Sequence, residues 1–153
     1  MKSFFRINFG VLLFSCVFFL VGCSSGAPSG TDSDVKELVL QIAKDEIRDQ
    51  IAPLMYQKVT NVPVGMLGMK ITYDTLVQEK DKEKVPEVLK AIDAAMGEMA
   101  ISLENIRPES VNDELKKSES SADLVVNGEK NPISYTAQFN SDGDLYVEVY
   151  GLR

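Results

Sequence analysis

Apolar residues recur at helical spacing in two parts of the chain. The first part begins after Asp34, which stands three residues before Glu37 in the arrangement of a capping box. Pro53 is expected to end or kink this helix, since proline lacks a backbone N–H and clashes with the preceding turn. A second helix is expected from Pro86, because proline is favoured at the first helical position. Its apolar stripe comprises Val85, Val88, Leu89, Ile92, Met96 and Met99.

From Ala100 onward the apolar period changes from helical to two, which is typical of half-buried strands. Asn127-Gly128 and Asp142-Gly143 are strong turn signals, so at least the last two strands should pair as an antiparallel hairpin. The upstream helices can cover the apolar face of such a sheet. The expected fold class is therefore α+β, with N-terminal helices packed on a four-stranded antiparallel meander. The alternating apolar residues are Ile101 and Leu103; Ala122, Leu124 and Val126; Ile133, Tyr135, Ala137 and Phe139; and Leu145, Val147 and Val149.

The segment between the two helices supports more than one interpretation. Residues 61–71, NVPVGMLGMKI, combine two glycines with Met66 and Met69. An exposed loop of this kind could contact an apolar ligand or partner, because methionine is adaptable and glycine lets backbones approach closely. A buried connection under the sheet is the alternative, and residues 69–77 are left open between strand and helix. The alternating charges of residues 79–84 predict a solvated turn.

The start of the chain has the three zones of an export signal. Lys2 and Arg6 are basic, the run from Phe9 to Val21 is apolar, and Gly22 follows it. A helix that spans a bilayer needs about 20 apolar residues, and this run is shorter. Residues 1–22 are therefore expected to be a signal peptide that is removed.

The residues Leu20-Val21-Gly22-Cys23 resemble the lipobox of bacterial lipoproteins, with an aliphatic residue three places before an invariant cysteine. The resemblance implies cleavage between Gly22 and Cys23 and attachment of a diacylglycerol to the Cys23 sulfur. Two or three acyl chains hold a protein stably on a membrane. In Gram-negative lipoproteins an aspartate after the lipid cysteine typically retains the protein in the inner membrane, and here that residue is Ser24. The resemblance thus implies a lipid-anchored protein of the bacterial cell envelope, at the periplasmic face of the outer membrane.

Small and polar residues follow the lipobox. Residues 24–33, SSGAPSGTDS, contain no apolar residue larger than alanine or proline. With Cys23 they are expected to form a lipidated, flexible linker, residues 23–33, in which the ten residues 24–33 reach about 16 to 19 Å on average. Residues 34–153 then form a single α+β domain. Its layout is similar to the cystatin-like group of small α+β folds, and a layout alone implies no function.

Composition removes several classes of chemistry. The chain has no histidine, and its two cysteines are Cys16, within the signal peptide, and Cys23. A Ser-His-Asp or Cys-His catalytic set, a His/Cys zinc site, a haem site and an iron–sulfur cluster are therefore excluded, and no metal or cofactor is expected. Without Lys2 and Arg6 the basic residues fall from 16 to 14 against 23 acidic ones, a formal charge of −9. Such a chain repels nucleic acid and anionic headgroups, so the domain is expected to stand off the bilayer.

Two groups of acidic residues resemble reactive or metal sites. The stretch from Asn140 to Asp144 has the acidic spacing of a calcium loop but lacks the glycine and glutamate that an EF-hand needs, so a hairpin turn is expected. A glycosidase-like enzyme needs two carboxyls roughly 5 to 9.5 Å apart. With 23 acidic residues some pairs will meet that spacing by chance. The candidate pairs are Asp142 or Asp144 with Glu148, and Glu104 with Glu109.

The last strand carries a possible recognition surface. Tyr146, Glu148, Tyr150 and Leu152 fall on the side opposite its core-facing residues, and tyrosine adds contact area with a polar tip. A helix lying over this row is the alternative. The sequence thus favours a non-enzymatic binding or interaction module with an unknown envelope protein as partner. A small apolar ligand bound at residues 61–71 is the alternative function, and a carboxylate hydrolase ranks last.

Overall fold

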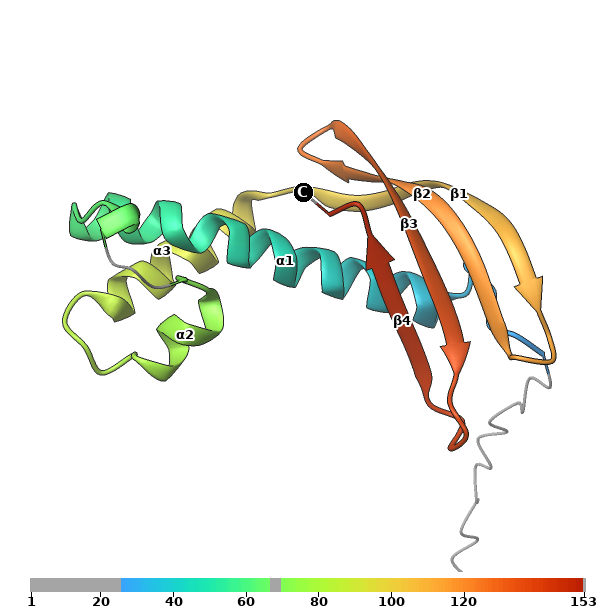
Figure 1. Ribbon diagram of the computed structural model, residues 1–153. Coiled ribbons are helices and arrows are strands. Elements are labelled where there is room, and N and C mark those ends of the chain that lie inside the picture. Colours follow the sequence, from blue (N-terminus) through green and yellow to red (C-terminus); the bar gives the residue numbers. More distant parts are fainter. Residues whose placement is uncertain (1–25, 67–69, 153) are drawn as a thin grey trace, which may run out of the picture.

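The computed structural model describes residues 26–66 and 70–152 (Figure 1). The lipobox, with Gly22 and Cys23, and Met69 lie outside the described residues. The strands form one antiparallel sheet in the order β1-β2-β3-β4. The predicted α+β class, with helices before a four-stranded antiparallel meander, is therefore confirmed. The elements are α1 (Ser33–Thr60), a 3-10 turn η1 (Val64–Met66), α2 (Tyr73–Gln78), α3 (Val85–Glu98), β1 (Ile101–Asn112), β2 (Lys117–Val126), β3 (Glu129–Phe139) and β4 (Leu145–Tyr150).

Both predicted turns close hairpins. Asn127 and Gly128 have positive φ angles of 51° and 87° between β2 and β3, and Val126 pairs with Glu129 across them. The tight turn therefore fixes the register of these two strands. The sequence assigned one set of alternating strand residues to the core. In the structure these residues lie toward α1. The buried residues of this first cluster are Val35, Val39, Ala43, Ala122, Leu124, Ile133, Tyr135, Ala137 and Val147.

The start of α1 differs from the prediction. Asp32, not Asp34, is the N-cap residue, and Asp34 lies in the first turn of the helix. The Asp32 carboxylate accepts a hydrogen bond from the Ser29 backbone N–H at 2.8 Å, so it closes the turn that precedes the helix. The capping box predicted between Asp34 and Glu37 is therefore wrong.

Pro53 does not end α1, which continues to Thr60. Proline inside a helix removes one backbone hydrogen bond. The second half of α1 nevertheless stays helical because it packs on a second apolar cluster. That cluster consists of Ala52, Ile71, Leu76, Val85, Val88 and Ile92, with Ile51, Met55, Tyr56 and Val59 of α1 partly buried against it.

The second cluster forms a helical lobe, residues 51–66 and 70–98, that lies away from the sheet (Figure 1). The predicted stripe of α3 is confirmed, since Val85, Val88 and Ile92 are buried in this cluster. The sequence left residues 69–77 open between strand and helix; in the structure α2 begins at Tyr73 and is capped by reciprocal hydrogen bonds between Thr72 and Thr75. Within the described chain, α1 supplies the cover of the sheet, while α2 and α3 contact α1. None of the described helices has the length and apolar character needed to cross a bilayer.

Part of the predicted flexible linker packs on the sheet. The Tyr135 hydroxyl donates to the Gly30 carbonyl at 2.8 Å, and the Ser118 hydroxyl donates to the Pro28 carbonyl at 2.5 Å. Pro28 and Gly30 are buried. A side chain at position 30 would collide with Ser120, whose Cβ would lie 2.8 Å from the added carbon, so glycine is required there. The packed domain therefore begins no later than Gly26, and not at Asp34 as predicted.

Candidate interaction surface

The outer side of β4 carries the predicted tyrosine row. Tyr146 and Tyr150 are 52% and 51% exposed, whereas Val147, between them, is buried toward α1. Of the described helices, α1 packs on the core side of the sheet and α2 and α3 lie away from it, so the alternative of a helix over the row is not observed in this part of the chain (Figure 1). Leu152 does not belong to the row. Gly151, with a φ of 90°, redirects the chain, and Leu152 packs against the first apolar cluster.

A single carboxylate connects the two tyrosines. The Tyr146 hydroxyl donates to Glu148 Oε1 at 3.1 Å, and the Tyr150 hydroxyl donates to Oε2 at 2.7 Å. The hydrogen bond from Tyr150, then that from Tyr146, and the nearby charge of Lys117 hold the pKa of Glu148 below its ordinary value. The same two hydrogen bonds raise the pKa values of Tyr146 and Tyr150. At neutral pH the row is therefore a charged carboxylate held between two neutral phenols.

The row continues across the sheet as a polar surface, which we call the outer face. Tyr146 pairs with Gln138 of β3, Glu148 with Thr136, and Tyr150 with Ser134. The same register brings Lys117, Glu119 and Ser121 of β2 alongside these residues. Because side chains alternate along a strand, all of them project away from the core. The outer face comprises Glu104, Asn105, Arg107, Lys117, Glu119, Ser121, Asp123, Lys130, Ser134, Thr136, Gln138, Tyr146, Glu148 and Tyr150.

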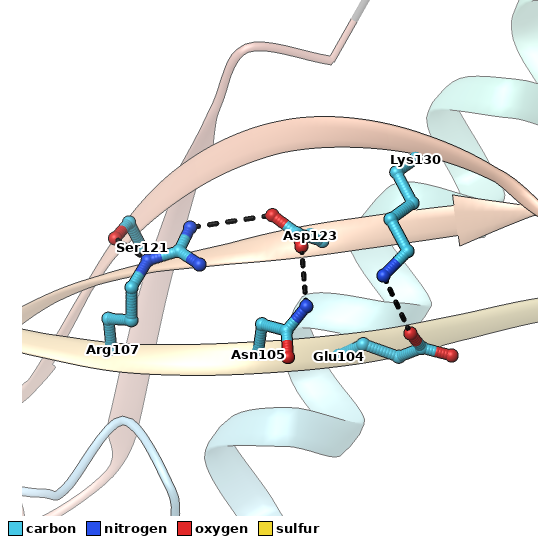
Figure 2. Close-up of polar contacts among 6 residues, drawn as sticks. All are labelled: Glu104, Asn105, Arg107, Ser121, Asp123 and Lys130. Atoms are coloured by element: carbon cyan, nitrogen blue, oxygen red, sulfur yellow. Dashed lines mark hydrogen bonds and ion pairs between the residues drawn. The ribbon is translucent and has the colours of Figure 1, made fainter.

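A second carboxylate, Asp123, organises the β1 side of the outer face. Figure 2 shows Asn105 and Arg107 of β1 converging on it from the neighbouring strand. Asn105 Nδ2 donates to Asp123 at 2.7 Å, and Arg107 forms an ion pair with it at 3.4 Å. The Arg107 side chain also donates to the Ser121 hydroxyl at 3.3 Å. The hydrogen bond from Asn105 is the largest cause that lowers the pKa of Asp123. The hydrogen bond and the positive charge of Arg107 lower that pKa further.

A β-bulge makes this convergence possible. The register between β1 and β2 shifts between Glu104 and Arg107, and Asn105 has a φ of 50°. Such a bulge redirects side chains, and here it lets Asn105 and Arg107 reach the same carboxylate. Beside them, Lys130 of β3 pairs with Glu104 at 3.4 Å (Figure 2). Apolar spacing cannot locate a bulge, so the sequence pattern does not reveal this cluster.

Three members of the predicted carboxylate pairs, Glu148, Glu104 and Asp144, are engaged in other contacts. Glu148 is held by the tyrosines, and its pKa is lowered, whereas a general acid needs a raised one. Glu104 forms its ion pair with Lys130, and Glu109 is exposed near the second register shift of β1. Asp144 lies in the hairpin turn that the sequence favoured over a calcium loop.

The Asn140 side chain holds that turn. Its Oδ1 accepts the backbone N–H groups of Asp142 and Asp144 at 2.9 and 2.8 Å. Across residues 26–66 and 70–152, no group of three or more His, Cys, Asp or Glu side chains is placed to hold a metal ion.

Two other surface features carry less information. In the Gly/Met segment, Ile71 is buried and Val64 is partly buried in the helical lobe; Met69, and the side chain of Met66, lie outside what the structure describes. An open groove of about 810 Å³ lies between α1 and the start of β1. Its lining mixes charges of both signs with apolar side chains, so it points to no single ligand chemistry. Lys36, Glu37, Leu40, Lys44, Asp45, Arg48, Ile101 and Leu103 are among its lining residues.

Comparison with known proteins gives this chain no relative. No protein-family model, no curated protein and no solved structure matches it. The functional interpretation therefore depends on the residues and geometry of the chain itself, and the outer face is the surface on which they converge most clearly.

Proposed function

We propose that this protein is a lipid-anchored component of the bacterial cell envelope whose outer face binds a partner protein without catalysing a reaction. The observation that carries the proposal is an uncovered sheet face on which two exposed tyrosines share one carboxylate. The lipobox resemblance supports the anchor at Cys23, and Ser24 supports a place at the periplasmic face of the outer membrane.

The tyrosine row suits protein recognition for an energetic reason. Immobilising a side chain on binding costs about 0.5–1.5 kcal/mol, and a side chain that is already restrained loses less. Glu148 restrains both hydroxyls before any partner arrives. Tyrosine is also enriched at protein interfaces, where its ring supplies contact area and its hydroxyl a hydrogen bond.

The charges of the outer face favour a protein over a nucleic acid. Acidic and basic side chains intermingle there, with ion pairs of Arg107 to Asp123, Lys117 to Glu119 and Lys130 to Glu104. A surface of mixed sign suits a partner with its own mixed charges. The formal charge of the whole chain, −7, repels nucleic acid.

Site-specific photo-cross-linking of the full-length protein in its own membrane tests the proposal. A photoreactive residue at Gln138, which pairs with Tyr146, should cross-link to an envelope protein that mass spectrometry identifies. The same residue at Glu83, exposed in the helical lobe, should not. The double variant Tyr146→Ser/Tyr150→Ser should abolish the Gln138 product while its free energy of unfolding stays within about 0.5 kcal/mol of wild type, as for other surface changes.

The matched control replaces exposed apolar residues elsewhere. Leu54 and Val77 are 64% and 41% exposed in the helical lobe, and Leu54→Ser/Val77→Ser should leave the Gln138 product intact. A stable tyrosine variant that still gives the full product would remove the tyrosines from the proposed binding surface.

A further inference from the structure

The described chain begins beside one end of the sheet, next to the connection between β1 and β2 (Figure 1). The Ala27 backbone N–H donates to Asp113 Oδ1 in that connection at 3.1 Å. Pro28 and Gly30 then continue along β2 and β3 through hydrogen bonds from Ser118 and Tyr135. The point at which the chain reaches the domain is therefore fixed at this end of the sheet.

The end of β1 and the connection to β2, residues 111–116, expose two large apolar side chains, and we call this segment the hairpin tip. Leu115 is 68% exposed, the largest exposed fraction among the large apolar residues described. Val111 is 61% exposed, a fraction that only Leu115 and Leu54 exceed. The Leu115 backbone N–H donates to Asn112 Oδ1 at 2.9 Å, so a side chain of the tip fixes the turn that presents Leu115.

The hairpin tip carries charges of both signs, two acidic and one basic, and Lys117, which follows it, pairs with Glu119 at 3.8 Å. Asp113 and Glu114 are followed directly by Leu115 and then by Lys116 and Lys117. Lys116 and Lys117 therefore partly offset, beside the exposed apolar side chains, the repulsion between this acidic chain and anionic headgroups. Basic side chains close to apolar ones are the combination that interfacial segments use to contact phospholipid.

The sequence separation between the predicted anchor and this tip is short. Two residues lie between Cys23 and Gly26, and the three residue steps from one to the other span about 10 Å when fully extended. Interfacial apolar groups lie about 5–10 Å into the boundary between headgroups and acyl chains. Because the Ala27 backbone N–H is bound to Asp113 of the tip, the domain is held within reach of the surface in which its lipid is embedded.

We propose that the hairpin tip is a membrane-contact surface, with Val111 and Leu115 seated in the headgroup region of the phospholipid bilayer that holds the anchor. This inference rests on the lipid anchor of the proposed function. It reverses the expectation that a long linker holds the domain off the bilayer. It also orients the molecule, since α1 has 28 residues, about 42 Å at 1.5 Å per residue, and carries the helical lobe away from the tip (Figure 1).

The other turn at this end of the sheet is the competing contact. The β3–β4 turn lies at the same end (Figure 1) and presents Asp142 and Asp144 with no basic residue between Asn140 and Asp144. Anionic headgroups repel two carboxylates that lack a neighbouring cation. The domain is therefore expected to tilt so that the β1–β2 tip, and not this turn, meets the lipid.

Depth-dependent fluorescence quenching of the acylated full-length protein tests the inference. The protein is placed in vesicles of phosphatidylethanolamine with a minor share of phosphatidylglycerol, with and without brominated acyl chains. A fluorophore is attached at Glu114→Cys in the tip or, as the matched control, at Glu83→Cys in the helical lobe; both glutamates are exposed. Quenching at position 114 should be at least about fivefold stronger than at position 83, since the interfacial layer is only about 5–10 Å deep.

A second pair of variants separates contact from mere proximity. Val111→Ser/Leu115→Ser should lower the quenching at position 114 to the level of position 83, whereas Leu54→Ser/Val77→Ser should leave it unchanged. Equal quenching at the two positions in acylated, vesicle-bound protein would overturn the membrane contact and leave the anchor standing. Undiminished quenching at position 114 in Val111→Ser/Leu115→Ser would overturn it too. Intact mass reports the anchor independently, and a mature protein without added acyl mass would overturn both proposals.

Discussion

The two ends of α1 are held in the fold by different kinds of contact. Its first half packs on strands that come from much later in the chain, and Tyr135 and Ser118 tie the preceding segment to the same sheet. Its second half packs on α2 and α3, which follow it closely in the sequence. The sheet end is thus assembled from distant segments with buried polar contacts, while the helical lobe is largely local and apolar.

One polar connection holds α2 against α1 at the border of the helical lobe. The Tyr73 backbone N–H donates to Asp49 Oδ1 at 2.9 Å, and the Arg48 guanidinium lies 4.7 Å from the centre of the Tyr73 ring. The tyrosine row and the hairpin tip both belong to the sheet end. Because the two ends of α1 are held by different contacts, we expect the helical lobe to open locally without disturbing either proposed surface.

The largest expected effect comes from removing a core side chain of the helical lobe. Ile92 is fully buried in the second cluster, and Ile92→Ala should cost about 2–5 kcal/mol, since the deleted atoms leave a cavity. If the two ends of α1 belong to separate cooperative units, hydrogen exchange should accelerate in α2 and α3 while β2 and β3 keep their protection. Exchange measured by mass spectrometry on the intact protein resolves these segments.

Ile133→Ala supplies the matched control in the sheet. Ile133 is buried in the first cluster, and its loss should accelerate exchange in β2, β3 and the first half of α1. Equal acceleration throughout the molecule for both variants would show that α1 couples the two clusters into one unit, and the comparison drawn above would fail.

A smaller effect is expected from the hydroxyl that fixes the N-terminal segment. Tyr135→Phe removes the donor to the Gly30 carbonyl, and an unsatisfied buried acceptor costs about 1–3 kcal/mol. Urea unfolding should show this loss, and exchange should rise at residues 28–32. Tyr150→Phe, which alters an exposed hydroxyl on the outer face, should change stability by less than about 0.5 kcal/mol. An unchanged stability of Tyr135→Phe would mean that the segment is not held by this bond.

The sequence predicted the sheet end well where one face of a strand is buried. Alternation identified Ala122 and Tyr135 as inward-facing and Tyr146 and Tyr150 as outward-facing, because a strand has only two sides. The turn residues then predicted where the strands reverse direction, and residues such as Gly128 have the positive φ that these turns need. Neither signal reveals that Glu148 joins the two tyrosines, since that depends on side-chain rotamers.

Two of the differences from the prediction, at Pro53 and in the segment before α1, share a physical cause, which is that tertiary contacts override local preference. Pro53 is tolerated because α3 packs against the half of α1 that follows it. The segment from Gly26 to Asp32 has no apolar period, and buried backbone carbonyls, such as that of Gly30, are what attach it to the sheet. Composition alone predicts a flexible linker for such a segment. Only its hydrogen-bond partners on β2 and β3 show that it packs on the sheet.

The smallest expected effect concerns the ionisation of Glu148. Its folded pKa is lowered, so the contribution of its hydrogen bonds to stability is present above the unfolded pKa and is lost as the pH falls through the folded value. NMR titration of its carboxyl carbon should give a midpoint below that of an ordinary glutamate. Tyr150→Phe should raise this midpoint more than Tyr146→Phe does, because the Tyr150 bond is the larger cause and the shorter of the two, at 2.7 against 3.1 Å. If neither substitution moves the midpoint, the hydroxyls do not hold the carboxylate in solution, and the restrained tyrosine row that distinguishes the sheet end would have no support.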